Sequence, residues 1–423
     1  MRTRGLLALL TAALTLLAAG CGGNDGDGAG DEAAVGPLGA VEIAEGEPIK
    51  IATLQSISGA TASLGQDQVR GIEIAIEEKG DIMGHPVDLQ TEDEGCNAEG
   101  GTTAAQRVVA DPQLVGIIGT SCSGAAVPAS EIMSEAGLVM ISGSNTSPAL
   151  TSDLEENEGD AYQSGYFRVA HNDIVQGQAA AEFVYNELSK TKVATIHDGD
   201  PYTEGLANAM GSSFRELGGE VVLATAINKG DTDMRPVLTE VAAAGAEVLY
   251  FPIFQPEGDF IAKQAREIPG LRDAAILFGA DGLLSDTYVT IPATEGMYFS
   301  GPATPTGGDY DAFVETYREK NGEAPIQAFH AHAYDAANLL MQKAEEVAEE
   351  RDGTLVIDRQ KLRDALHATD GFEGLTGNLT CDDFGDCASP KIDIVRNTQA
   401  EQEIEDVRGN VLFTYEPEGT DSE

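Results

Sequence analysis

A single cysteine lies among small and hydroxyl-bearing residues in the stretch GTSCSGAAVPASEI, which covers residues 119–132. The apolar run LVGIIG precedes it and a helical pattern follows from about Ser123. Backbone N–H groups and the Ser123 hydroxyl should therefore lie at the start of a helix, where the positive end of the dipole favours an anion. Three kinds of chemistry are open here: a Cys122 nucleophile, a phosphate-binding loop, or a cradle for a small ligand.

The first two of these possibilities lack their sequence signatures. A phosphate-binding loop needs a Gly-Lys-Ser/Thr ending, and no Lys or Arg occurs between Arg107 and Arg168. A G-x-S-x-G nucleophile elbow starting at Gly119 would need a glycine where Ser123 stands. None of the six histidines lies in a motif that would supply a general base, which also argues against a secreted hydrolase. The pattern therefore favours the ligand cradle.

A second stretch rich in hydroxyls, SGSNTSPAL at residues 142–150, follows the next apolar run along the chain. Ligands of open α/β sheets bind at the carboxyl ends of the strands, and both stretches come directly after a predicted strand. We therefore expect Ser144, Asn145 and Thr146 to face Ser123. The alternative for each hydroxyl is a role as a helix cap or turn residue.

The elements that must position these residues form two series. From Pro48 onward, β-branched runs alternate with amphipathic stretches, which is the pattern of helices packed on a parallel sheet. A long polar loop near residues 143–165 separates the two series, and we expect later segments to return to both. We therefore predict an α/β protein with two doubly wound lobes, the first from residues 48–168 and 300–372 and the second from residues 169–299 and 373–416.

The N-terminus has the features of a secretory signal peptide over residues 1–20. Arg2 and Arg4 precede an apolar run, and the segment closes with LAAGC at Cys21, which resembles the lipobox of bacterial lipoproteins. The resemblance implies that Cys21 becomes the lipidated first residue, whereas the alternative is an ordinary signal with an incidental cysteine. Residues 21–47 are rich in Gly and acidic residues, so we expect a disordered tether. The expected location is outside the cytoplasm, anchored to the membrane by lipid.

Charge and cysteine content agree with export. The chain has 423 residues with 25 Lys and Arg against 71 Asp and Glu, a formal net charge of −46. That charge repels nucleic acid and anionic membrane surfaces. Apart from Cys21, four cysteines remain, and by neighbourhood in an oxidising compartment they pair as Cys96 with Cys122 and Cys381 with Cys387.

Two further signals do not predict a metal site. The Asp-rich stretch CDDFGDC at residues 381–387 lacks the spacing of a calcium loop and is better explained as a turn closed by a disulfide. His330 and His332 lie two apart in a predicted helix, so they point to different faces. We expect no metal and no cofactor.

Several stretches resemble the branched-chain amino-acid (Leu/Ile/Val) substrate-binding proteins of bacterial ABC transporters. They are IATLQSISGATASLGQDQVRGIEIAIEE, GTSCSGAAVPASEIMSEAGLVMISGSNTSPALT, ATIHDGDPYTEGLANAM and FPIFQPEGDFIAKQAR. The resemblance covers about residues 48–415. It implies a type I periplasmic-binding fold, in which two lobes joined by three hinge crossings close around a ligand. It also implies a monomeric receptor without enzymatic activity that delivers a small molecule to a membrane permease.

The resemblance implies roles for individual residues. The hydroxyls that bind the ligand carboxylate correspond to Ser123 and Thr146, and the carbonyl that accepts a hydrogen bond from the ligand ammonium corresponds to Ser144. The acid that pairs with the ammonium corresponds to Asp281, and Cys122 becomes a wall of the pocket. Tyr202 and Phe254 are candidates for the aromatic wall, because the chain has no Trp; these two residues and Leu64 complete the expected site.

Two departures from the family pattern bear on the ligand. Leu64 stands where the typical branched-chain binder has Tyr, and Asp281 is one methylene shorter than the usual Glu. The resemblance therefore supports the general ligand class, an amino acid or related small molecule, more than it supports a ligand with a branched side chain. The alternatives are a receptor for amides, urea or aromatic carboxylic acids, and a sensor module that presents its bound state to a signalling partner.

Overall fold

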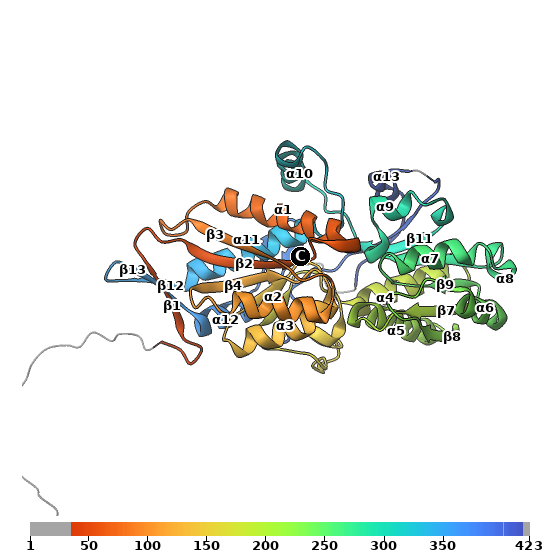
Figure 1. The fold of residues 1–423 in the computed structure, drawn as a ribbon, viewed down its shortest axis with the longest axis horizontal. Helices are drawn as coiled ribbons and strands as arrows, with labels where there is room; N and C mark the ends of the chain where they lie inside the picture. The colour runs from red at the N-terminus through yellow and green to blue at the C-terminus, as the bar shows by residue number, and fades with distance from the viewer. Residues whose placement is uncertain (1–34, 401, 418–423) are drawn as a thin grey trace, which may run out of the picture. The chain divides into compact units, whose positions relative to one another are not determined.

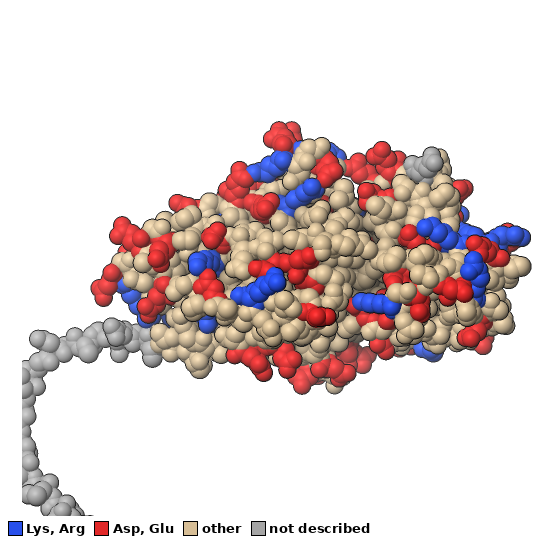
Figure 2. Space-filling view, in the orientation of Figure 1, with Lys and Arg blue, Asp and Glu red and all other residues tan. Residues whose placement is uncertain are grey.

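The structure, a computed structural model, describes residues 35–400 and 402–417. The signal peptide expected at residues 1–20 and the expected lipidation site Cys21 lie outside the described residues. Within the described part of the chain, no helix has both the length and the apolar composition needed to cross a bilayer. Figure 2 shows acidic side chains scattered over the visible surface among fewer basic ones, as expected from the net charge.

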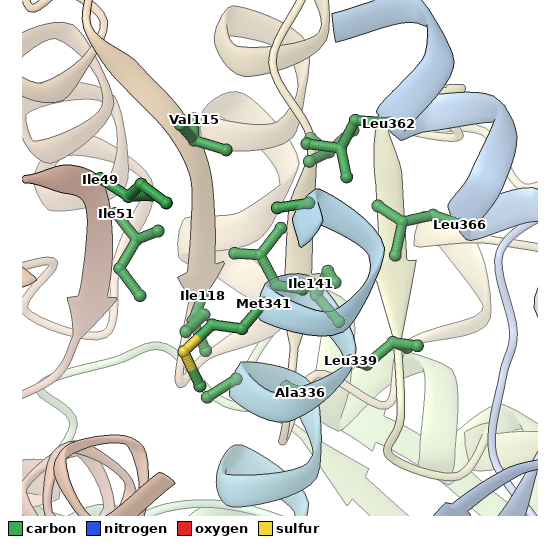
Figure 3. Packing of buried hydrophobic residues seen from close by; sticks show 14 of the residues in the cluster. Ile49, Ile51, Val115, Ile118, Ile141, Ala336, Leu339, Met341, Leu362 and Leu366 are labelled. Atoms are coloured by element: carbon green, nitrogen blue, oxygen red, sulfur yellow. The ribbon is translucent and has the colours of Figure 1, made fainter. Parts of the chain in front are cut away.

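The first lobe is built on a five-stranded parallel sheet with the order β3-β2-β4-β5-β6. Helices cover both faces, because the strands are apolar on both sides. On one face, α1, α11 and α12 pack on strand residues such as Ile51, Val115 and Ile141 (Figure 3). On the other face lie α2 and α3. The elements are β2 (Ile49–Gln55), β3 (Val87–Asp93), β4 (Leu114–Gly119), β5 (Met140–Ser142), β6 (Tyr166–Arg168), α1 (Ala62–Lys79), α2 (Ala98–Val108), α3 (Ser123–Glu135), α11 (His330–Val347) and α12 (Arg359–His367).

The second lobe is built on a seven-stranded sheet with the order β17-β16-β11-β10-β9-β7-β8. Its strands β7, β8, β9 and β11 are labelled in Figure 1. Strands β7 to β11 are parallel, whereas β16 and β17 join the edge antiparallel. Helices α4 and α5 cover one face, and α6, α7, α9 and α13 cover the other. The elements are β7 (Lys192–His197), β8 (Glu220–Ala226), β9 (Val248–Tyr250), β10 (Ile276–Ala280), β11 (Tyr298–Pro302), β16 (Ile392–Arg396), β17 (Val411–Tyr415), α4 (Asp173–Glu182), α5 (Pro201–Glu216), α6 (Arg235–Ala244), α7 (Glu257–Ala265), α9 (Asp286–Val289) and α13 (Ile404–Gly409).

The described chain crosses between the two lobes after β6, after β11 and before β16. The predicted class, two wound α/β lobes with a three-stranded hinge, is confirmed. Residues 373–387 were assigned to the second lobe, but the hairpin of β14 (Phe372–Gly374) and β15 (Gly377–Leu379) lies with the first. Leu379 and Cys387 are buried in the first-lobe core, and the backbone N–H of Leu375 donates to Asp335 on α11. The chain therefore changes lobe only after Cys387.

The expectation of a disordered tether over residues 21–47 is wrong for its last part. Residues 40–44 form strand β1 (Ala40–Ala44), which pairs antiparallel with β13 (Thr354–Asp358), and β13 pairs in turn with β12 (Ala348–Arg351). Val41 and Ile43 lie two apart, so they face the same side of the strand and are buried in the first-lobe core. The burial of these two apolar side chains attaches β1 to the first lobe.

Candidate ligand-binding site

A cleft between the two lobes contains most of the residues that the sequence predicted for a ligand site. On the first lobe, the ends of β4 and β5 and the start of α3 lead into it; on the second, the end of β10 and the start of α5 do. Of the eight predicted site residues, the structure brings seven into the lining. The lining consists of Ala60, Thr61, Ser63, Leu64, Ser121, Cys122, Ser123, Ser144, Tyr202, Phe254, Gln255, Asp281, Gly282, Ser285, Gln327 and Phe329.

The first-lobe half of this cleft holds hydroxyls and backbone groups but no ionisable side chain. Helix α3 begins at Ser123, so its first N–H groups have no partner within the helix. The Ser144 hydroxyl donates to the carbonyl of Ser121 at 2.9 Å and to Gln68 Oε1 at 3.1 Å, which holds the β5 loop against the start of α3. This half therefore presents hydrogen-bond donors and the positive end of a helix dipole.

Thr146 is the one predicted site residue that does not line the cavity. It is 1% exposed, and its carbonyl accepts a hydrogen bond from the N–H of Asp173 at 2.9 Å. Thr146 therefore lies behind the cavity wall, at the junction between the β5 loop and the first helix of the second lobe.

The second-lobe half of the cleft is organised around Asp281, which follows β10. Its Oδ1 accepts hydrogen bonds from Gln176 Nε2 at 2.6 Å and from the Tyr202 hydroxyl at 3.2 Å. Burial raises the pKa of Asp281 to about 6, against the effect of the Gln176 hydrogen bond. Burial also raises the pKa of Tyr202 well above its ordinary value, so this phenol stays neutral. Asp281 is the one lining residue that carries a charge near neutral pH.

Two buried polar residues behind Asp281 were missed by the sequence analysis. Gln176 and Asp173 lie three apart on α4, and both are fully buried. Burial, with the nearby charge of Asp281, raises the pKa of Asp173 well above its ordinary value. The signal that would have found them is the spacing of two polar residues on one face of a helix that directly follows a strand.

The cavity is small, because the lobes contact each other around it. The space open to the centre of a water-sized sphere is about 20 Å³, enough for one or two water molecules. The Ser147 hydroxyl of the first lobe donates to the Pro201 carbonyl of the second at 2.9 Å. A Cβ on Gly124 would lie 2.3 Å from Asp200 Oδ2. A ligand therefore has to enter through a separation of the lobes.

Both predicted disulfides are confirmed. Cys96 is bonded to Cys122 and Cys381 to Cys387, so Cys122 forms a wall of the cleft and has no free thiol. Within residues 35–400 and 402–417, no group of three or more His, Cys, Asp or Glu side chains is placed to hold a metal ion.

A second cavity of about 860 Å³ lies on the hinge side, next to α10 (Gly308–Asn321) and α13. The segment 325–330 separates it from the ligand cleft. Gln327 and Phe329 line the cleft, whereas Ala328 and His330 line the hinge cavity. The buried Asp67 carboxylate accepts hydrogen bonds from the N–H groups of Ile326 and Gln327, each at 3.1 Å, which holds this segment on α1.

Comparison with known proteins agrees with this arrangement of two lobes around a cleft. Residues 48–386 match the family described as periplasmic binding protein. The chain belongs to this family. Members of a binding-protein family hold solutes, and the lobes and interlobe cleft described above are the parts that such a function requires.

Individual members of the family also resemble the chain along most of its length. The Leu/Ile/Val-binding protein homolog 3 of Brucella melitensis is 30% identical over 82% of this chain and 91% of that protein. A leucine-, isoleucine-, valine-, threonine- and alanine-binding protein of Pseudomonas aeruginosa is 29% identical over 80% of this chain and 87% of that protein. The crystal structure of a leucine-binding protein from Thermotoga maritima superimposes with a TM-score of 0.74 at 26% identity, covering 87% of this chain and 99% of that one.

Proposed function

We propose that this family member is an extracytoplasmic receptor that captures a small α-amino acid with an uncharged side chain and delivers it to an ABC permease. The observation that carries the proposal is the contrast across the cleft. Hydroxyls and the start of α3 face it from the first lobe, and the Asp281 carboxylate faces it from the second. A zwitterion complements both halves, with its carboxylate at Ser123 and its ammonium at Asp281.

The same lining limits the side chain of the ligand. No second ionisable group that is charged near neutral pH lines the cleft, so a charged ligand side chain would be desolvated without a partner. Leu64, Phe254 and Phe329 form an apolar cluster beside the cleft, which suits an aliphatic group. The names of the Brucella and Pseudomonas relatives, which refer to aliphatic amino acids, support this class.

The family also supports a location outside the cytoplasm, and we propose that Cys21 attaches the chain to the membrane through lipid. The support is the LAAGC sequence before a segment of Gly and acidic residues. Cys21→Ser should release the protein from membranes into the soluble fraction after export. Membrane association unchanged by Cys21→Ser would contradict the lipid anchor, and a size measurement by light scattering on the released protein would test the expected monomer.

A ligand screen tests the proposed function. Purified protein is heated with glycine, alanine, threonine, valine, leucine, lysine, glutamate, acetamide, urea or benzoate, because a ligand at one hundred times its Kd adds about 2.7 kcal/mol to the free energy of unfolding. We expect stabilisation by one or more neutral amino acids and none by lysine or glutamate. Stabilisation by amides or benzoate alone would replace the proposal with a receptor for ligands that lack an ammonium.

A further inference from the structure

The side chain of Arg168, the last residue of β6, is fully buried and makes five hydrogen bonds. Nη1 donates to the carbonyls of Asn145 at 3.4 Å and Ser147 at 2.8 Å. Nη2 donates to Thr151 Oγ1 at 2.5 Å and to Asp386 Oδ2 at 2.9 Å, and Nε donates to Asp386 Oδ1. Three of the five bonds go to the loop after β5 that carries Ser144 and Thr146. Arg168 therefore holds this loop in place without lining the cleft itself.

Asp386 extends the same network toward the second lobe. Besides the guanidinium, its Oδ2 accepts hydrogen bonds from Thr151 Oγ1 at 2.8 Å and from Asn172 Nδ2 at 3.1 Å. Asn172 is the N-cap of α4, because its Oδ1 accepts from the N–H of Ile174 at 3.0 Å. Helix α4 carries Gln176, which donates to Asp281. One carboxylate thus contacts the supports of both halves of the ligand cleft.

The turn that carries Asp386 is closed by the Cys381–Cys387 disulfide. It lies along β6: the N–H of Arg168 donates to the Gly385 carbonyl, and the N–H of Cys387 donates to the Arg168 carbonyl, each at 2.9 Å. Inside the turn, Asp382 Oδ1 accepts from the N–H groups of Phe384 and Asp386 at 2.9 and 2.8 Å. Three constraints therefore fix the conformation of Asp386: the disulfide, the backbone bonds to β6 and the Asp382 side chain.

We propose that Asp386, held by the Cys381–Cys387 turn, is a positioning residue for ligand binding, which sets the hydroxyl half and the acidic half of the cleft in register through Arg168 and Asn172. The proposal rests on the proposed function, because it assigns the hydroxyl half to the ligand carboxylate and Asp281 to the ammonium. Neither Arg168 nor Asp386 lines the cleft, so both act through other residues.

The network would act by preorganising the cleft. Two lobes that close on a hinge can meet in many slightly different arrangements, and an ion pair or hydrogen bond to a ligand is strong only in a narrow range of geometry. Arg168 lies at the first crossing between lobes and Asp386 next to the third, so their ion pair ties two of the three crossings together. A planar guanidinium that donates in a fixed fork restricts their relative orientation more than a single hydrogen bond would.

The test compares three single variants and one double variant by calorimetry with the best ligand from the screen. Asp386→Asn removes the charge at nearly constant shape and should weaken affinity by about tenfold to thirtyfold. Cys381→Ser with Cys387→Ser should weaken it by about twofold to fivefold, because Asp382 still holds the turn. Asp383→Asn, on an exposed residue of the same turn, should leave affinity unchanged. Leu238→Ala, in the distant second-lobe core, lowers stability without touching the network and should also retain affinity.

Hydrogen exchange of the ligand-free proteins supplies a readout independent of the ligand. In Asp386→Asn, amides of residues 143–152 and of the start of α4 should exchange faster, whereas Leu238→Ala should leave both segments protected. Unchanged affinity and unchanged exchange in folded Asp386→Asn would overturn the proposal, as would an equal loss of affinity in Leu238→Ala. If the wild-type protein binds no amino acid, the proposed function fails, and unchanged exchange in the two segments would separately reject the positioning role.

Discussion

The two halves of the ligand cleft come from lobes of similar architecture but use different chemistry. The first lobe offers hydroxyls and the start of a helix, whose partial charges do not titrate. The second lobe offers a carboxylate whose pKa burial raises to about 6. Binding by the first-lobe half should therefore be independent of pH, whereas binding by Asp281 in the second-lobe half should depend on pH. In the proposed binding mode, the pH dependence of ligand affinity therefore comes from the ammonium side of the cleft.

Of the changes that test this comparison, Asp281→Ala should have the largest effect on ligand affinity. Removal of one member of a desolvated charge pair costs about 2 to 5 kcal/mol in comparable interfaces, so amino-acid affinity should fall by roughly thirtyfold to several thousandfold. Calorimetry would measure it, with Glu295→Ala, an exposed acid of the same lobe, as the matched control. Wild-type affinity in Asp281→Ala would mean that the ligand has no ammonium at this position.

Ser123→Ala should have a smaller effect, because the N–H groups at the start of α3 remain. Loss of one hydrogen bond to a charged group costs about 1.5 to 3 kcal/mol, which corresponds to roughly a tenfold to hundredfold loss of affinity. Ser130→Ala, on the same helix and away from the cleft, is the control. An effect of Ser123→Ala larger than that of Asp281→Ala would reverse the proposed ranking of the two halves.

Acidic pH should weaken binding through the second-lobe half alone. Ammonium binding needs the ionised Asp281, and a carboxyl with a pKa of about 6 becomes protonated as pH falls below that value. Affinity should be nearly constant above about pH 7 and about tenfold weaker at about pH 5, since one pKa unit corresponds to a factor of ten. Asp281→Asn should bind weakly with a flat profile, and an equally steep profile in this variant would assign the titration to another group.

Removal of the Cys96–Cys122 disulfide should have the smallest effect on affinity and a large effect on stability. The bond closes a loop across 26 residues, so Cys96→Ser with Cys122→Ser should lower the free energy of unfolding by roughly 3 to 4 kcal/mol. Affinity should stay within about threefold, because in the proposed binding mode the charged ends of the ligand meet Ser123 and Asp281 rather than sulfur. Denaturant unfolding and calorimetry on the same variant would separate the two quantities, and a tenfold loss of affinity would give the disulfide a direct role in recognition.

Local pattern was sufficient for the two lobes and for the hydroxyls that follow β4 and β5, whereas Asp281 and Tyr202 were predicted only from the resemblance to the Leu/Ile/Val-binding proteins. Ser123 and Asp281 each follow a buried strand of a parallel sheet, and strand ends of such a sheet collect at one edge. Arg168 and Asp386 were not predictable in the same way, because their contact joins residues 218 positions apart. The sequence of the Cys381–Cys387 turn indicates a closed turn, but its packing along β6 depends on tertiary structure.

Strand β1 illustrates a different limit of prediction from composition. A window rich in Gly and acidic residues averages to a polar segment, although its last part pairs with β13 and buries Val41 and Ile43 in the first-lobe core. Two apolar residues at strand spacing are a weak signal until a partner strand is known. Thr146 shows the reverse case, since a hydroxyl predicted to face the ligand lies behind the wall of the cavity.

The segment 325–330 offers a way to build an optical sensor from this protein. From Gln327 to His330 the residues alternate between the ligand cleft and the hinge cavity, so a ligand that displaced Phe329 should also move Ala328 and His330 on the other side. An environment-sensitive dye attached at Val314→Cys, which also lines the hinge cavity, would occupy space that no ligand needs. Its emission would then report occupancy of the cleft without blocking it.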